Sequence, residues 1–181
     1  MPSKNSILRK PRVVGVLRSG LCGLFLLFSA TGCGIYSFTG TSLSPDIKSI
    51  TISNFSNNSG GGPPTLSQSF SEKVRDYYQR NTNLDLVTRN ADLTLEGTIV
   101  SYTVTPLPPS ANDVASQSRL TIGIKATYQN LKDETQNFDE SFSFYADFPS
   151  NQNLATVEAS LIETISDQII ILMFNKSVAN W

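Results

Sequence analysis

Residues 119–131, RLTIGIKATYQNL, decide the fold class of this 181-residue chain. Apolar and polar side chains alternate along them, which predicts a β-strand with one face in a core and the other in water. The face expected in the core consists of Leu120, Ile122, Ile124, Ala126 and Tyr128. Thr121, Lys125 and Thr127 are expected on the opposite face. Alternation of this kind is typical of antiparallel sheets with one solvated face.

The segment that follows predicts a second strand paired with the first. A hairpin turn at Lys132–Thr135 leads into residues 136–148, in which Phe138, Phe142 and Phe144 share one face. Because the turn is short, the two strands are expected to be antiparallel neighbours.

The segment upstream of residue 119 predicts a third long strand, residues 93–105. Pro106 ends it, because proline cannot donate a ladder hydrogen bond. Beyond Thr98, the apolar side chains of this strand move from the odd-numbered to the even-numbered positions. The change indicates either a bulge at Gly97 or burial of both faces at the far end.

The first part of the globular sequence predicts a strand, a helix and a short strand. Residues 48–55 alternate as a strand, residues 57–64 form a glycine-containing connector, and residues 84–87 form the short strand. Between them, residues 65–81 predict an amphipathic helix. Its apolar stripe consists of Leu66, Phe70, Val74, Tyr77 and Tyr78.

The last part of the chain predicts a second helix, with Asn153 as its N-cap. Its apolar stripe consists of Leu154, Val157, Leu161, Ile165, Ile169, Leu172 and Met173. Near the end, the stripe widens into the continuous apolar run Ile169–Phe174. Six apolar residues in a row cannot all face one core, so part of the run could meet a partner. We favour burial within the chain, because large exposed apolar patches are uncommon on monomers.

Together these elements predict an α+β fold in the order β-α-β-β-β-α. The expected sheet is mainly antiparallel and has about four strands, with both helices packed on one face. The other face is rich in Thr, Ser, Lys and Glu. This face is expected to contact water or the polar lumen of a larger protein.

The N-terminus has the order of a secretory signal: basic residues, the short apolar run 21–28, and small residues leading into Cys33. The sequence Ser29–Cys33 resembles the lipobox of bacterial lipoproteins, which predicts a signal peptide at residues 1–32, acylation of Cys33 and a single domain over residues 33–181. An uncleaved anchor is disfavoured, because spanning a bilayer takes about twenty apolar residues. A disulfide between Cys22 and Cys33 would require that the signal peptide is not removed.

The residues after Cys33 predict where the protein is anchored. Two or more acyl chains hold a protein stably on a bilayer. No acidic residue follows Cys33 directly, and by resemblance to lipoprotein sorting signals this favours the outer membrane. We expect the domain on its periplasmic face.

The composition excludes several classes of function. After removal of the signal, 9 basic and 15 acidic residues remain, a net charge near −6, so we expect no nucleic-acid partner. The chain has no histidine, and an acylated Cys33 leaves no free thiol. Ordinary zinc sites and Cys-His or Ser-His-Asp catalysis are thereby excluded. We expect no catalytic residue, metal or cofactor. Chemistry by paired carboxylates stays formally open, but adjacent strand residues such as Asp139 and Glu140 point to opposite faces.

Several local segments, in the same order along the chain, resemble the lipopolysaccharide-assembly lipoprotein family, LptE. They are GCGIYSF at 32–38, IKSITI at 47–52, LTLEG at 93–97, FSFYADF at 142–148 and FNKSVANW at 174–181. The resemblance implies a non-enzymatic protein that pairs with a large outer-membrane β-barrel, LptD. Such proteins sit partly in the barrel lumen, help the barrel to assemble and aid lipopolysaccharide transfer to the outer leaflet. The alternative is a lipoprotein subunit or scaffold of another outer-membrane assembly machine.

The resemblance also implies a lipid ligand, and lipid A is anionic, so its site should contain Lys or Arg. Arg119, Lys125 and Lys132 are the nearest approach to a basic cluster, in or beside one hairpin. They are the candidate lipid or barrel contacts. Solubility of an exposed strand explains the same residues equally well.

Overall fold

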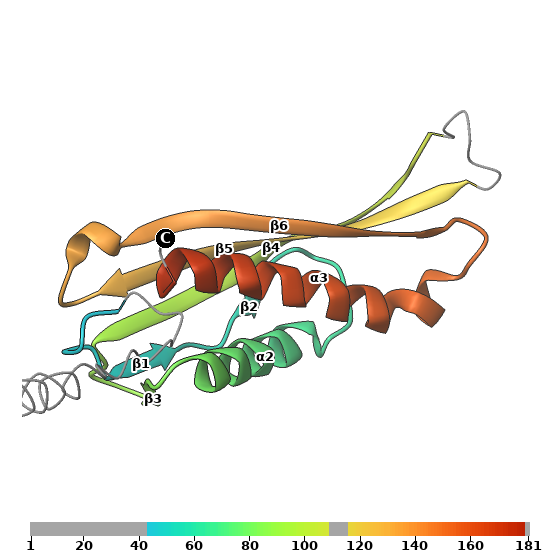
Figure 1. Ribbon diagram of the computed structural model, residues 1–181. Helices are drawn as coiled ribbons and strands as arrows, with labels where there is room; N and C mark the ends of the chain where they lie inside the picture. The colour runs from blue at the N-terminus through green and yellow to red at the C-terminus, as the bar shows by residue number, and fades with distance from the viewer. Residues whose placement is uncertain (1–42, 109–115, 180–181) are drawn as a thin grey trace, which may run out of the picture. The chain divides into compact units, whose positions relative to one another are not determined.

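Figure 1 shows the protein as a computed structural model, which describes residues 43–108 and 116–179. The expected signal peptide, Cys33 and the closing Asn180 and Trp181 lie outside the described residues. Acylation of Cys33 therefore stays a prediction.

The fold is α+β, as the sequence predicts. The described elements are β1 (Ser49–Ile52), β2 (Ser56–Asn57), α2 (Leu66–Asn81), β3 (Asp85–Leu86), β4 (Leu93–Pro106), β5 (Gln117–Asn130), the short 3-10 turn η2 (Glu134–Gln136), β6 (Phe138–Pro149) and α3 (Leu154–Ser177). Both long helices and all three long strands lie where the sequence periodicity places them.

The sheet has six strands and is mixed, which corrects the expectation of about four mainly antiparallel strands. Its order is β3-β1-β4-β5-β6, and β2 also pairs with β4. β5 pairs antiparallel with both β4 and β6. β1 pairs in parallel with β3 and β4, and β2 pairs in parallel with β4. The short strand expected at residues 84–87 is present as β3, whereas β2 lies at the start of the expected connector, where two residues are too few to show a period of two. The parallel pairs arise because α2 crosses back between β1 and β3.

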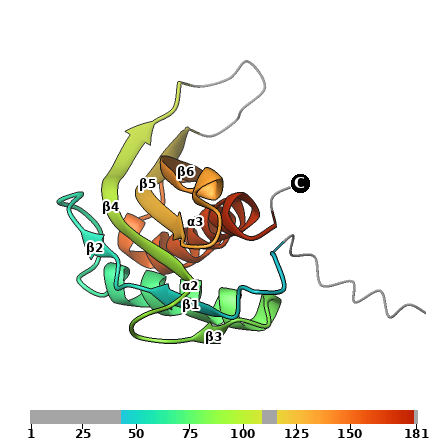
Figure 2. The same ribbon diagram turned by 90° about the vertical axis from the view of Figure 1, so that its left-hand side faces the viewer.

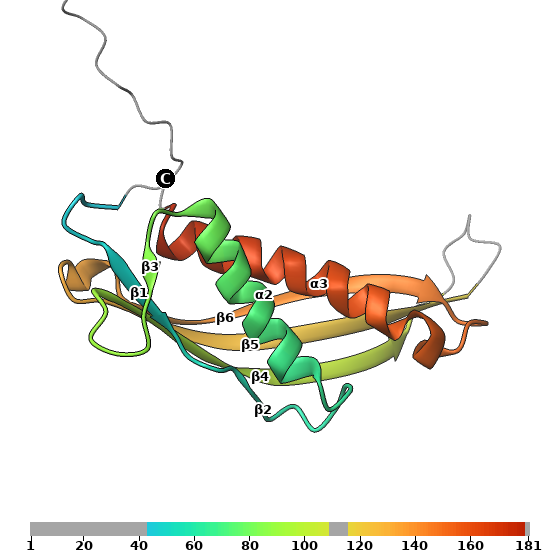
Figure 3. The same ribbon diagram turned by 90° about the horizontal axis from the view of Figure 1, so that it is seen from below.

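Both helices pack on one face of the sheet (Figures 1 and 3). α2 buries Leu66, Phe70, Val74 and Tyr78, and α3 buries Leu161, Ile165 and much of the apolar run at its end. In that run Ile169, Ile170, Met173 and Phe174 are buried, and Leu172 is 44% exposed. Burial within the chain is thus confirmed for most of the run.

A hydrogen bond joins the two helices inside the core. The hydroxyls of Tyr78 and Ser177 are 2.6 Å apart. Burial of the Tyr78 ring raises the pKa of its hydroxyl, so the group stays protonated and can donate. The bond satisfies two polar groups that would otherwise be buried without partners.

The bulge in β4 lies at Val100, and the expectation of a bulge at Gly97 was wrong. The register with β5 shifts between Ile99 and Ser101. The extra residue changes which side chains face the helices, so Tyr102 turns inward and its hydroxyl donates to Glu158 Oε1 of α3. Gly97 has a different role: a Cβ there would lie 2.5 Å from a carbon of the Phe55 ring, so the glycine makes room for that ring.

Neither helix of the described part of the chain combines the length and the hydropathy that a membrane-spanning segment needs.

Candidate binding face

The strands β4, β5 and β6 present one face that neither helix covers, which we call the open sheet face (Figure 2). Alternate residues of each strand form it. β4 contributes Thr94, Glu96, Thr98, Ser101, Thr103 and Thr105; β5 contributes Arg119, Thr121, Gly123, Lys125 and Thr127; and β6 contributes Asp139, Ser141, Ser143, Tyr145 and Asp147. Hydroxyl groups dominate this surface, and the expectation of a polar outer face is confirmed.

Arg119 forms an ion pair and a cation–π contact with residues of β6. Its Nε and Nη2 atoms donate to the two carboxylate oxygens of Asp147 at 2.7 and 2.9 Å. Its guanidinium carbon lies 3.6 Å from the centroid of the Tyr145 ring, a cation–π contact. The hydrogen bonds from Arg119 hold the pKa of Asp147 below its usual value. Arg119 is therefore half of a neutral pair, and a phosphate would have to displace Asp147 to bind it in the same way.

Lys125 also has a carboxylate partner. Its ammonium lies 2.9 Å from Asp139 Oδ2, and the hydroxyl of Thr127 donates to the other oxygen at 3.2 Å. The hydrogen bond from Lys125 is the main reason why the pKa of Asp139 is lowered. Because Arg119 and Lys125 are six residues apart on one strand, their backbones are separated by about 20 Å.

Lys132 lies in the β5–β6 connection, 3.6 Å from Asp92 Oδ1. Asp92 has nearer partners: its Oδ2 accepts the N–H of Lys48 at 3.0 Å and the hydroxyl of Ser49 at 3.0 Å. The pKa of Asp92 is lowered mainly by the hydrogen bond from the Lys48 backbone. Thus the structure does not bring Arg119, Lys125 and Lys132 together, and each has its own acidic neighbour.

A shallow groove of about 240 Å³ lies where the open sheet face meets the segment after β1. It is lined by Ser53, Asn54, Glu96, Gly97, Thr98, Lys125 and Thr127. Glu96 and Lys125 line it together with hydroxyl and amide groups. This arrangement suits hydrogen bonding to a polar surface and shows no preference for an anion.

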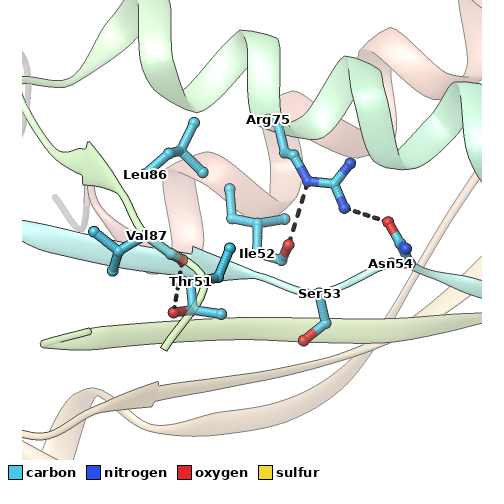
Figure 4. A pocket seen from close by; sticks show the side chains of 8 residues that line it. Thr51, Ile52, Ser53, Asn54, Arg75, Leu86 and Val87 are labelled. Atoms are coloured by element: carbon cyan, nitrogen blue, oxygen red, sulfur yellow. Dashed lines mark hydrogen bonds between the residues drawn. The ribbon is translucent and has the colours of Figure 1, made fainter. Parts of the chain in front are cut away.

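A second groove, of about 410 Å³, is lined in part by Arg75, to which no sequence motif pointed (Figure 4). Arg75 of α2 donates from Nε to Ile52 O at 3.3 Å and from Nη2 to Asn54 Oδ1. Ile52 O is the carbonyl of β1 that would bond to β3 if β3 were longer, since Val87 N–H bonds to Ile50 O. Arg75 thus caps the edge of the sheet, a role that no sequence period signals.

The described residues contain no group of three His, Cys, Asp or Glu side chains that could hold a metal ion. Arg119 and Lys125 of the open sheet face pair with carboxylates of β6 across strands, and most of its other groups are hydroxyls. What this arrangement offers is a broad, polar contact surface.

Comparison with solved structures gives matches at low identity, with TM-scores below 0.5. A minor lipoprotein from Acinetobacter baumannii is 9% identical, with 72% of this chain and 91% of that chain covered and a TM-score of 0.47. An uncharacterised lipoprotein B from Nitrosomonas europaea is 12% identical, with 70% and 79% covered and a TM-score of 0.47. The rare lipoprotein B from Shewanella oneidensis is 13% identical, with 70% and 89% covered and a TM-score of 0.45.

Comparison of sequences gives a family match. No curated protein matches the chain. A family model described as LptE, lipopolysaccharide-assembly, matches residues 47–177. The matched range includes every described element from β1 to α3.

Proposed function

The chain belongs to the lipopolysaccharide-assembly family LptE, and we propose that it is an outer-membrane lipoprotein that acts with a large LptD-like β-barrel in lipopolysaccharide transport and outer-membrane assembly. The family match over residues 47–177 is the observation on which this proposal rests. The proposed role is one of contact and not of catalysis.

The open sheet face supports a barrel partner. The interior of a large outer-membrane barrel is polar and wet. A face made mostly of Thr and Ser, on which Asp147 and Asp139 neutralise Arg119 and Lys125, can enter such a lumen with little unpaired charge. We propose that the open sheet face contacts the barrel wall.

Contact with lipopolysaccharide is the second part of the proposal. Arg119, Lys125 and Lys132 remain the proposed contacts. Because each of them already has a carboxylate neighbour, lipid binding requires competition with that carboxylate. An anionic group must compete with Asp147 for Arg119 and with Asp139 for Lys125. The surface is therefore expected to bind the lipid weakly, as a transfer step requires, because a tightly held cargo would not be released.

The anchor is the third part. We propose that Cys33 is acylated and that the domain stays close to the inner leaflet of the outer membrane. Nine residues lie between Cys33 and Leu43, and the ten residue-to-residue steps of an extended chain span at most about 35 Å.

The test uses depletion and purification together. Depletion of the protein is expected to lower lipopolysaccharide at the cell surface, and the tagged lipoprotein purified in detergent is expected to carry a large β-barrel. Cys33→Ala should leave the precursor uncut or mislocalised, as mass spectrometry of the mature N-terminus would show. Normal surface lipopolysaccharide together with a different co-purifying machine would support the alternative, a subunit of another outer-membrane assembly system.

A further inference from the structure

The two edges of the sheet are unequal. At one edge, β3 has two residues, and beyond it the Ile52 carbonyl of β1 is capped by Arg75. At the other edge lies β6, which has twelve residues and, within the described residues, pairs with β5 alone. A long free edge is a template for pairing with another strand, and soluble proteins normally block it.

Backbone hydrogen bonds establish which groups of β6 point outward. Leu107 N–H bonds to Gln117 O at 2.8 Å, so the odd-numbered residues of β5 bond to β4. The even-numbered residues therefore bond to β6, as Ser150 N–H bonds to Ser116 O at 2.9 Å. The partners of these even-numbered residues on β6 are also even-numbered.

Five residues of β6 consequently direct both N–H and C=O away from the sheet. They are Asp139, Ser141, Ser143, Tyr145 and Asp147. Among the hydrogen bonds of residues 43–108 and 116–179, none reaches the backbone of these five. A chain added here would gain a continuous hydrogen-bond ladder.

The protection of this edge is confined to its ends. Glu140 points to the helix side and pairs with Lys176 at 2.9 Å, and Pro149 closes the other end. Between them the register with β5 is unbroken, and no proline or inward charge interrupts residues 141–147. The middle of β6 therefore has none of the features that normally block strand addition.

Aromatic side chains flank the open part of this edge. Phe142 and Phe144 are half-buried on the helix side, and Tyr145 is 47% exposed on the open sheet face. The rings of Phe144 and Tyr145 are nearly parallel, at 16°, with centroids 5.7 Å apart. An added strand would cover both rings with alternate side chains, which is how strand addition acquires specificity.

We infer that the free edge of β6 receives an extended, uncharged segment of the barrel partner by strand addition; this inference rests on the proposed function. The wall strands of a closed barrel are paired on both sides, so the segment must come from a part of the partner outside the wall. Its side chains should alternate between apolar, against Phe142 and Phe144, and small or aromatic, beside Ser143 and Tyr145. No net charge is required, because Asp139 and Asp147 already have their cations.

A second copy of the chain fits this edge less well. Antiparallel self-pairing that uses all five outward residues is symmetric about Ser143. It places Asp139 of one copy opposite Asp147 of the other, twice, and like charges directly opposite are destabilising.

The experiment compares Ser143→Pro with Ser143→Ala in the full-length lipoprotein. Proline removes the outward N–H and leaves the bonds to β5, while alanine removes only the hydroxyl. The barrel co-purifying in detergent is expected to fall at least about fivefold for Ser143→Pro, as for loss of a hydrogen bond, and to fall clearly less for Ser143→Ala, which loses one hydroxyl contact of the open sheet face and keeps the outward N–H. Thermal unfolding of both variants checks the fold.

Hydrogen exchange of the unmodified protein gives a second test that does not depend on a variant. Amides of residues 139–147 that exchange rapidly in the free protein should slow by about a hundredfold in the complex. If the barrel co-purifies but Ser143→Pro and exchange show no effect, strand addition is wrong and the proposed function stands. If the wild type carries no barrel, both fail. A wild-type dimer that Ser143→Pro converts to monomer would overturn the choice of occupant.

Discussion

Replacement of Gly97 by alanine is expected to destabilise the domain, because two immovable neighbours occupy the space of a Cβ atom. A Cβ at this position would lie 2.5 Å from a carbon of the Phe55 ring and 2.6 Å from the backbone oxygen of Lys125. The Phe55 ring is itself held edge-on against Phe70, with centroids 5.1 Å apart, so it cannot move without disturbing the helix–sheet core.

The magnitude follows from two opposing effects. Overpacking a core position by a methyl group costs about 1–3 kcal/mol, and the stiffer unfolded chain of the alanine variant returns about 0.4–1 kcal/mol. A net loss of about 1–2 kcal/mol corresponds to a fall of about 3–8 °C in Tm for a domain of this size. Urea unfolding followed by circular dichroism would measure the loss directly, provided that the m-value is unchanged.

Gly123→Ala is the matched control. Gly123 lies on the adjacent strand, and a Cβ there would also meet an atom at 2.5 Å, but that atom is the hydroxyl of Ser101, which can rotate away. Gly123→Ala should therefore lower Tm much less than Gly97→Ala. Equal losses for the two variants would refute the reasoning, because they would show that the immobility of the neighbour does not decide the cost.

Three further outcomes are expected. Ile165→Asp places an unpaired charge at a position that is 0% exposed and should cost about 3–5 kcal/mol in urea unfolding; a Tm near the wild-type value would show that α3 does not pack as described. Because Arg119 lowers the pKa of Asp147 in the folded state, the Asp147 carboxylate stabilises the fold above its unfolded pKa, and that stability is lost as the pH falls toward the lower pKa of the folded state. Tm should therefore be level from pH 6 to 8, where no histidine titrates. Below about pH 4 it should fall, and the fall should be less steep in Asp147→Asn. The buried Tyr128 hydroxyl has no partner among the described residues, so Tyr128→Phe should leave Tm unchanged or raise it, whereas Tyr78→Phe, which removes a bond inside the core, should lower stability by about 1 kcal/mol.

The long elements could be predicted from the sequence because each has a strong period and a recognisable end. α3 begins after Asn153, whose side chain accepts from Ala155 N–H as an N-cap should. The strand of residues 119–131 and its hairpin partner are present with the expected faces. A period of two or 3.6 repeated over ten or more residues is a signal that tertiary contacts rarely override.

What could not be predicted depended on contacts between distant segments. β2 has two residues and exists only because β4 offers it an edge, and the parallel pairing of β1 with β3 and β4 has no signal in the sequence period. The change of parity indicated a bulge as one of two alternatives but did not give its position, because the position depends on the register with β5. The cations of the candidate site were correctly placed on or beside one hairpin, but their neutralisation by Asp147 and Asp139 depends on the register between β5 and β6.

The unequal edges of the sheet limit how far it can extend. A strand that adds to β6 completes a hydrogen-bond ladder whose opposite end is a two-residue strand and an arginine cap, so no further strand can join there. Assembly through this sheet therefore terminates after one addition. A sheet with two long free edges risks growing into fibrils by repeated edge pairing, whereas a sheet with a single receptive edge can form pairs but not filaments.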